Sequence, residues 1–425
     1  MSTLASDDRL IELRRDLHRH PEPAWREFYT TARIVEELDR IGVDDLLVGP
    51  DALSGEHRCA VPDDDELESW FERAREAGAR EDVLSRLAGG YTGAIAVLRR
   101  GDGPTVGLRV DIDGLPRAES SDPAHVPAAE GFRSVNEGAM HACGHDAHAT
   151  IGIGVLEAIA ESDFSGTLKV FFQPAEEVIG GGKAIAESGH LDDVDYLLAL
   201  HVGLDHPTGT IVAGIDDFLA VTQFLAEFHG EAAHAAAAPE KGDNAIQALA
   251  TAIDGLYGIP RHSDGPTRVN AGLVGGGTAS NIIAEHAFIE GEVRGETTEL
   301  MEYVRERAER VLESAADMHG CDLDLEIVGE APSAESDEEL VSTVASIARD
   351  VPGVDTVLER DSLGASEDAT FLMNRVQERS GLATFVGIGT DHPGGHHTAT
   401  FDVDEESIPI GVEVIAGAIL ATDNV

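Results

Sequence analysis

Short apolar segments alternate with helical patterns through the first half of the chain, and this alternation restricts the fold more than any other feature. Four such segments lie between Gly93 and Val202, with the sequences GAIAVLRR, TVGLRVDIDGL, GTLKVFFQP and YLLALHV. Strands that alternate with helices in this way form a mainly parallel sheet with helices on both faces. The expected fold class is therefore α/β, with a mainly parallel central sheet flanked by helices.

The pattern changes near Asp217, which predicts a second domain inserted in the first. Three longer strand patterns follow, together with two long amphipathic helices near Asn244–Tyr257 and Thr298–Met318, and these are typical of a smaller α+β unit. After Pro332 the alternating pattern resumes and continues to a final helix. A chain of 425 residues also exceeds one ordinary core. We therefore expect a first domain in two parts, 1–216 and 332–425, and an inserted domain at 217–331.

The region before the sheet is expected to be helical. Leu10, Leu13 and Leu17 have helical spacing, and a second helix follows the HPEP segment. The polar stretch Asp63–Leu87 also has a strong helical pattern. We expect it to be a surface insertion, because its charged residues favour solvent.

The chain is unusually acidic, with 80 acidic and 30 basic residues and a formal net charge of −50. The acids are dispersed among periodic apolar residues, which argues against a disordered acidic tail. We interpret them as a surface adapted to high salt, where ions screen the repulsion, and so expect a halophilic source. The negative electrostatic field of such a surface repels phosphate groups, which disfavours nucleic acid as a partner.

Cysteine content and the N-terminal sequence favour a cytoplasmic protein. Three cysteines do not make a disulfide framework, and MSTLASDDRL lacks the basic and apolar regions of a signal peptide. No apolar run approaches the roughly 18 residues of a membrane span. We therefore expect no membrane association.

Two short motifs carry residues suited to binding a metal. HACGHDAH (His141–His148) and QPAEE (Gln173–Glu177) supply a thiol, imidazoles and two adjacent carboxylates, which are ligands of borderline-soft divalent metals. Cys143 alone would be better explained as an inert buried thiol. A structural zinc knot is a further alternative, but such knots usually use CxxC pairs, and the chain has none.

The remaining candidates follow strand ends, where ligands gather in parallel sheets. Asp111 and Asp113 end one expected strand, Glu176 and Glu177 follow another, and His201 ends a third. Separated ligands that converge on one rim are typical of an open catalytic site rather than of a local structural knot. These features favour a metal-dependent hydrolase.

The motifs resemble the amidohydrolase branch of the aminoacylase and carboxypeptidase family of dinuclear metallohydrolases. The matching stretches run in family order along nearly the whole chain and include RRDLHRHPE, LRVDIDGLP, MHACGHDAH, FQPAEE, ALHVG, HGEAAHAAAAPEKGDNA, SNII, EVRGE, SEDAT and HHTATFDVDE. The resemblance implies a zinc-peptidase-like catalytic domain interrupted by a smaller dimerisation or lid domain.

The resemblance also implies a site with two divalent metal ions, manganese or zinc. Glu176 is implied as the general base, and the implied metal ligands are Cys143, His145, Glu177, His201 and His397. A thiolate can bridge two ions, because a metal-bound thiol is deprotonated. The neighbouring His396 is the less favoured ligand.

Asp113 is interpreted as a residue that orients a ligand imidazole, with an acid capping a strand end as the alternative. Asp111 stands where other branches of the family have a metal-binding histidine, so no role is assigned to it. His148 is expected to be structural.

Three residues of the inserted domain, His234, Asn281 and Arg294, match family positions that contact substrate. A histidine or amide donor can stabilise an oxyanion, and an arginine can hold a carboxylate. For Arg294, a surface ion pair is nearly as good an explanation. Ala284 replaces a proline of the family pattern.

The implied activity is hydrolysis of N-acyl or N-aroyl amino acids, with p-aminobenzoyl-glutamate as the favoured substrate. One alternative is a broader hydrolase of hippurate or acetyl-amino acids. Another is a non-catalytic subunit of a heteromeric assembly, although the complete ligand set argues against it. The expected assembly is a homodimer, or a heterodimer with a related subunit.

Overall fold

The chain folds into two compact units. The computed structural model describes residues 3–392 and 394–422. The first unit runs to Asp216 and continues at Ala334–Leu363 and from Asp368 onward, whereas the second comprises Asp217–Ser333 and Gly364–Glu367. The segment Gly364–Glu367 therefore packs with the second unit, although the sequence pattern assigned it to the first.

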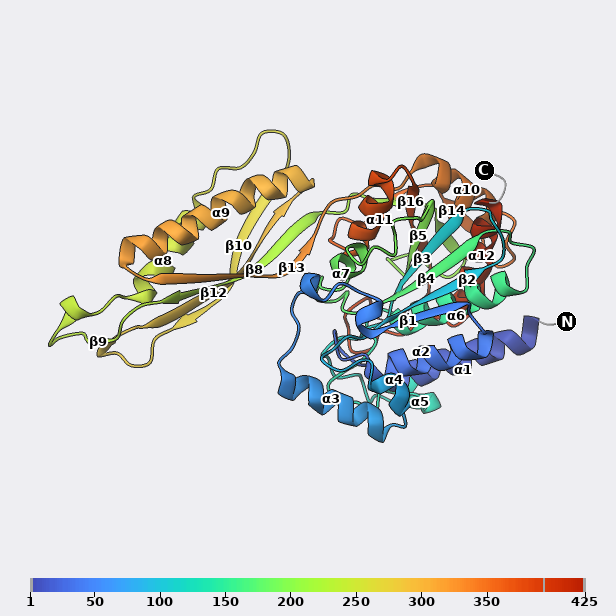
Figure 1. The fold of residues 1–425 in the computed structure, drawn as a ribbon, viewed down its shortest axis with the longest axis horizontal. Coiled ribbons are helices and arrows are strands. Elements are labelled where there is room, and N and C mark those ends of the chain that lie inside the picture. Colours follow the sequence, from blue (N-terminus) through green and yellow to red (C-terminus); the bar gives the residue numbers. More distant parts are fainter. Residues whose placement is uncertain (1–2, 393, 423–425) are drawn as a thin grey trace. The chain divides into compact units, whose positions relative to one another are not determined.

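An eight-stranded mixed sheet forms the centre of the first unit among the described residues (Figure 1). Its central strands β4, β3, β5 and β16 are mutually parallel, and antiparallel neighbours flank them. The mainly parallel sheet expected from the alternating pattern is confirmed. In sheet order, the strands are β1 (Asp45–Val48), β2 (Ala94–Arg99), β4 (Thr167–Gln173), β3 (Thr105–Asp111), β5 (Tyr196–Val202), β16 (Leu382–Ile388), β6 (Thr210–Val212) and β14 (Thr356–Leu358).

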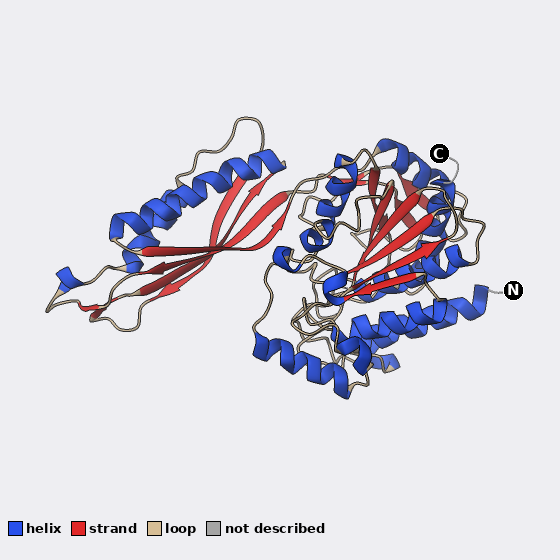
Figure 2. Ribbon diagram, in the orientation of Figure 1, coloured by secondary structure: helices blue, strands red, loops and turns tan. Residues whose placement is uncertain are grey.

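Helices lie on both sides of this sheet (Figure 2). The central strands are buried along almost their whole length, so both sets of alternating side chains are covered. The helices of this unit are α1 (Thr3–Arg19), α2 (Phe28–Ile41), α3 (Asp64–Glu76), α4 (Glu81–Leu84), α5 (Val126–Glu130), α6 (His145–Ala160), α7 (Gly182–Ala186), α10 (Glu338–Ala348), α11 (Ala369–Glu378) and α12 (Ser407–Thr422).

The second unit is a four-stranded antiparallel sheet with two long helices. The strand order is β10-β12-β8-β13, and the apolar faces of α8 and α9 pack on the sheet around Phe224, Phe228 and Val304. A short ribbon, β9 with β11, extends this unit. The elements are β8 (Ala220–His229), β9 (Ala233–His234), α8 (Ala245–Tyr257), β10 (Thr267–Gly276), β11 (Ile282–Ile283), β12 (His286–Gly295), α9 (Thr298–His319) and β13 (Asp322–Ala331).

The helical insertion differs from the single stretch that its pattern predicts. The chain breaks near Gly78, whose φ of 99° is left-handed, and so α3 and α4 are separate helices. Leu67 and Trp70 of α3 are buried, so the insertion presents an apolar face to the unit.

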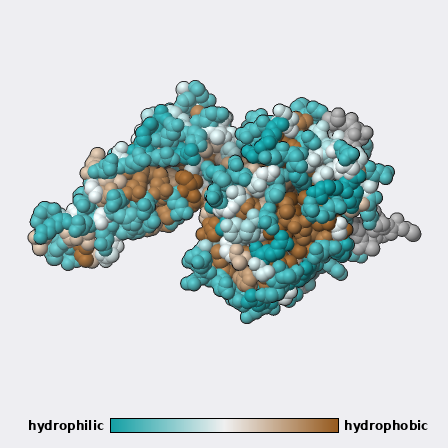
Figure 3. All heavy atoms as spheres, viewed as in Figure 1, coloured by the Kyte–Doolittle hydropathy of each residue, from teal (hydrophilic) through white to brown (hydrophobic). Residues whose placement is uncertain are grey.

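Hydrophilic residues cover most of the face seen in Figure 3, in keeping with the dispersed acids. Of the described helices, none is long and apolar enough to cross a membrane.

Candidate metal centre

Neighbouring parallel strands bring the predicted acids to one edge of the sheet. Asp111, at the end of β3, is in register with Gln173, at the end of β4. Asp113 lies two residues beyond the first strand, and Glu176 and Glu177 lie just beyond the second. His201 is in β5, the other parallel neighbour of β3.

A tight turn at Gly144 places Cys143 and His145 at the same edge. Gly144 has a φ of 88° and directly precedes α6. A Cβ atom here would lie 2.5 Å from Cγ2 of Val202, so the turn needs glycine for both conformation and space. The loop that carries His397 is attached to this turn, because the His397 amide donates to the Ala142 carbonyl (2.8 Å).

The five predicted ligands form two overlapping groups. Cys143, His145 and His201 could hold one ion, and Cys143, Glu177 and His397 could hold another, with the ligand atoms of each group within 4.8 Å of one another. The Cys143 thiol lies 3.4 Å from His201 Nε2, and His397 Nε2 lies 3.5 Å from Glu177 Oε2. The thiol is therefore placed where it could serve both groups.

The donor set fits a divalent cation. His145 Nε2 is buried without a hydrogen-bond partner among the described residues, while Nδ1 contacts Asp113 Oδ1 at 3.2 Å. A carboxylate behind a histidine in this way fixes the ring and leaves the other nitrogen for a metal. Asp113 Oδ2 also accepts a hydrogen bond from the Glu177 amide (3.0 Å). One carboxylate thus positions residues from both groups.

The electrostatics of the site also favour a cation. Burial opposes a charged His145, yet Asp111 and Asp113 raise its pKa well above the ordinary value. Burial and the charge of Glu177 raise the pKa of Cys143 to about 12. Positive charge is therefore stabilised here and an unpaired thiolate is not. Burial and the neighbouring His148 and His396 keep the pKa of His201 well below its usual value, so this ring is neutral, as a metal ligand must be.

Glu176 lies beside these groups. Its side chain is buried, and one of its oxygens lies within 4.8 Å of ligand atoms of His145 and Glu177. The preceding Ala175 has a left-handed φ of 57°, and His397 has one of 58°. Such conformations in non-glycine residues cost energy and concentrate at functional sites.

Two other histidines near the site are engaged within the protein. His148 contacts Asp111 through Nδ1, and its Nε2 accepts a hydrogen bond from the Val202 amide (2.8 Å). Both of its nitrogens are therefore used. His396 Nε2 accepts from the Leu204 amide (3.1 Å), and its Nδ1 lies 3.6 Å from the Cys143 thiol. His396 thus supports the site from beside His397.

The predicted residues of the second unit fall in two places. His234 is in β9 and Asn281 directly precedes β11, its partner strand, so the ribbon brings them together. The His234 Nδ1 accepts hydrogen bonds from the Ala236 and Ala237 amides. Arg294 lies near the other end of β12, where it forms a bidentate pair with Glu292 (2.8 and 3.0 Å).

A buried network that was not predicted from the sequence lies next to the site, around Arg109. Arg109 Nη1 donates to Asp111 (2.9 Å), its Nε donates to Gln173 (2.9 Å), and its Nη2 donates to Asp368 (3.2 Å). The sequence did contain a signal for this network, which is an arginine in the middle of an apolar strand. A buried charge needs partners, so acidic or polar side chains could have been expected around it.

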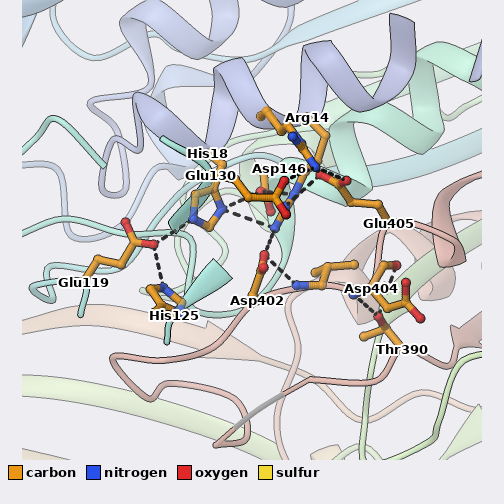
Figure 4. A network of polar contacts seen from close by, with 12 residues as sticks. Arg14, His18, Glu119, His125, Glu130, Asp146, Thr390, Asp402, Asp404 and Glu405 are labelled. Carbon is orange, nitrogen blue, oxygen red and sulfur yellow. Dashed lines mark hydrogen bonds and ion pairs between the residues drawn. The ribbon is translucent and has the colours of Figure 1, made fainter. Parts of the chain in front are cut away.

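A second missed network joins α1 to the site segments (Figure 4). Arg14 pairs with Asp146, next to His145, at 2.8 Å, and also with Asp402. His18 contacts Asp146 at 2.9 Å and Glu119 at 3.0 Å. Arg14 and His18 share the helical spacing of Leu10 and its periodic neighbours, so their place on the buried face could have been predicted.

Comparison with known proteins agrees with this site. Residues 107–421 match the model of Peptidase family M20/M25/M40. A solved dinuclear metal-binding peptidase of the M20 family from Bacillus subtilis is similar, with 26% identity, a TM-score of 0.68, and 98% of each chain covered. The fold and the site thus define a metal-dependent hydrolase.

Two curated relatives extend over nearly the whole chain. Indole-3-acetyl-aspartic acid hydrolase of Enterobacter agglomerans is 43% identical and covers 96% of this chain and 94% of its own. One subunit of the p-aminobenzoyl-glutamate hydrolase of Escherichia coli (strain K12) is 40% identical, with 97% and 95% covered. An aminobenzoyl-glutamate utilization protein from Klebsiella pneumoniae has a similar structure (TM-score 0.84, 36% identity, 97% and 95% covered).

The chain belongs to peptidase family M20/M25/M40, and within it to the metal-dependent amidohydrolases. The family resemblance expected from the sequence motifs is thereby confirmed.

Proposed function

We propose that this protein hydrolyses the amide bond between an aromatic acyl group and an acidic amino acid, with p-aminobenzoyl-glutamate as the favoured substrate. The observation that carries the proposal is the shared chemistry of the relatives. The names of two relatives that are 43% and 40% identical to this chain both specify an aromatic acyl group joined to aspartate or glutamate. Indole-3-acetyl-aspartate is therefore the second substrate to test.

We further propose a site of two divalent ions, manganese or zinc. Cys143 would contribute to both positions, His145 and His201 to one, and Glu177 and His397 to the other. The ions supply Lewis-acid activation of water and of the scissile carbonyl.

The surrounding residues have separate tasks in this proposal. Glu176 removes the proton from the attacking water and delivers it to the leaving nitrogen as the amide bond breaks. Asp113 holds the His145 ring and the Glu177 amide in place. His234 and Asn281 donate to the oxyanion, and Arg294 binds a carboxylate after exchanging its pair with Glu292.

The second unit is proposed to serve as a lid or dimerisation domain. The Escherichia coli relative is named as one subunit of its hydrolase, which supports an assembly with a related partner chain, and a homodimer is the alternative.

A broader specificity for N-acyl amino acids is the second candidate function. An N-acetylcysteine deacetylase of Bacillus subtilis, 29% identical over 98% of this chain, supports it. The complete donor set argues against a non-catalytic role in a larger assembly, because a subunit without activity has no need for a general base such as Glu176.

The test is release of free amino acid by the purified chain in high salt with manganese or zinc. Substrates are p-aminobenzoyl-glutamate, indole-3-acetyl-aspartate and hippurate. We expect activity to depend on metal and to fall by two or more orders of magnitude, about 10²–10⁴-fold, in Glu176→Gln. Glu187→Gln, an exposed glutamate further along the chain, is the matched control. Full turnover after chelation and dialysis, or in Glu176→Gln, would refute the mechanism.

A further inference from the structure

Arg117 carries a positive charge beside the candidate metal centre that no described carboxylate neutralises. The residue is exposed, and its side chain has no ion pair or hydrogen bond among the described residues. Arg294, the predicted carboxylate ligand of the second unit, is by contrast already paired with Glu292.

Backbone hydrogen bonds fix the segment that carries Arg117 to both metal-ligand loops. The Leu115 amide donates to the Met140 carbonyl (2.9 Å), and the Met140 amide donates to Leu115 (3.1 Å). At the other end, the Ser120 amide donates to the Ala399 carbonyl (2.8 Å). Met140 is three residues before Cys143, and Ala399 is two residues after His397. Arg117 thus lies on a short bridge between the two loops.

A buried carboxylate fixes this bridge to the interior of the first unit. Glu119, two residues from Arg117, contacts His18 Nε2 (3.0 Å) and His125 Nε2 (2.8 Å), as Figure 4 shows, and accepts from the Ser134 amide (2.6 Å). Its side chain has no exposed surface. A residue held on so constrained a segment can bind a ligand with little loss of conformational entropy.

At Ala399 the bridge adjoins the part of the site that contains His397. The side chain of His397 is 58% exposed, so this part of the site is open to solvent and to substrate.

We propose that Arg117 is a specificity-determining residue that binds a carboxylate of the amino-acid half of the substrate. This inference rests on the proposed function, because acidic amino acids are the substrates that supply such a group. A guanidinium binds a carboxylate through two parallel hydrogen bonds, and no carboxylate in the described part of the chain pairs with the charge of Arg117. Both the α-carboxylate and the side-chain carboxylate have this chemistry.

The experiment compares Arg117→Gln with the unaltered protein on three substrates: p-aminobenzoyl-glutamate, p-aminobenzoyl-glutamine and the α-amide of p-aminobenzoyl-glutamate. We expect kcat/KM on p-aminobenzoyl-glutamate to fall roughly 10- to 100-fold, mainly through KM. The analogue that lacks the recognised carboxylate should lose little, which identifies the group that is bound. Arg117→Lys should recover part of the loss, because lysine keeps the positive charge but cannot form the two parallel hydrogen bonds of a guanidinium.

Arg99→Gln is the matched control. It removes the same charge at the end of the strands that lies away from the metal centre. Arg99 is in register with Thr167, the first residue of β4, whereas the metal centre follows the last residue of that strand. If Arg117→Gln lowers kcat/KM equally on all three substrates, or no more than Arg99→Gln does, the inference is wrong. If the unaltered protein hydrolyses none of them, the proposed function fails instead, so the two failures are distinguishable.

Discussion

Replacing Arg14 by methionine should strongly destabilise the first unit. The Arg14 side chain is 1% exposed, and its guanidinium lies 2.8 Å from Asp146 and also pairs with Asp402. Despite burial, Arg14 and His18 hold the pKa of Asp146 well below its usual range. Methionine fills a similar volume but leaves both carboxylates without their main partner.

The magnitude follows from the contacts that remain. Removing one partner of a buried ion pair typically costs about 3–5 kcal/mol. His18 still contacts Asp146 at 2.9 Å, and the Val403 amide still donates to Asp402 (2.9 Å). We therefore expect the lower end, a loss of about 3 kcal/mol in the free energy of unfolding.

Urea unfolding followed by tryptophan fluorescence measures this loss. Both tryptophans of the chain, Trp25 and Trp70, lie in the first unit, so their emission reports on it. Asp402→Asn added to Arg14→Met should recover part of the loss, since it removes an uncompensated charge. Arg99→Met, which breaks an exposed pair with Asp45, should change little. A loss below about 1 kcal/mol in Arg14→Met would refute the reasoning.

Three further predictions concern metal affinity, pH and salt. Asp113→Asn should weaken binding of manganese or zinc by about 10- to 100-fold in calorimetry, because the carboxylate orients His145 and Glu177; unchanged affinity would contradict its positioning role. Burial and Arg14 oppose a charged His18, but Asp146 and Glu119 outweigh them and raise its pKa to about 9. The stability that His18 contributes should thus be complete below its unfolded pKa of about 6.5 and be lost as the pH rises through about 9, and urea midpoints in His18→Gln should lack this dependence. With a net charge of −50, the protein should lose tryptophan-detected structure on dialysis from molar salt to low salt, because the screening length grows from about 3 Å at 1 M to about 30 Å at 0.01 M; full stability in low salt would count against a halophilic surface.

Local patterns were sufficient for much of the fold. β5 has the bounds Tyr196–Val202 that its apolar run predicts, and α8 and α9 match the expected helices closely. The strand β13 was not predicted, although DLDLEI alternates strictly between polar and apolar residues. The break at Gly78 was also missed, because the charged residues on both sides of it favour helix equally.

Local patterns were enough to identify the kinds of donor and their places after strand ends, because the side chains that bind metals and the patterns that make strands are both local properties. Cys143, His145, Glu177, His201 and His397 could all be named from motifs and family resemblance. Three-dimensional packing was needed to show how buried charges pair, as Arg14 does with Asp402 and Arg109 with Asp368, which are 388 and 259 residues apart. The packing also shows which arginines pair with carboxylates, and that Arg117 has no such partner among the described residues. Such pairing depends on which surfaces meet when the chain packs, and no local pattern of residues records that.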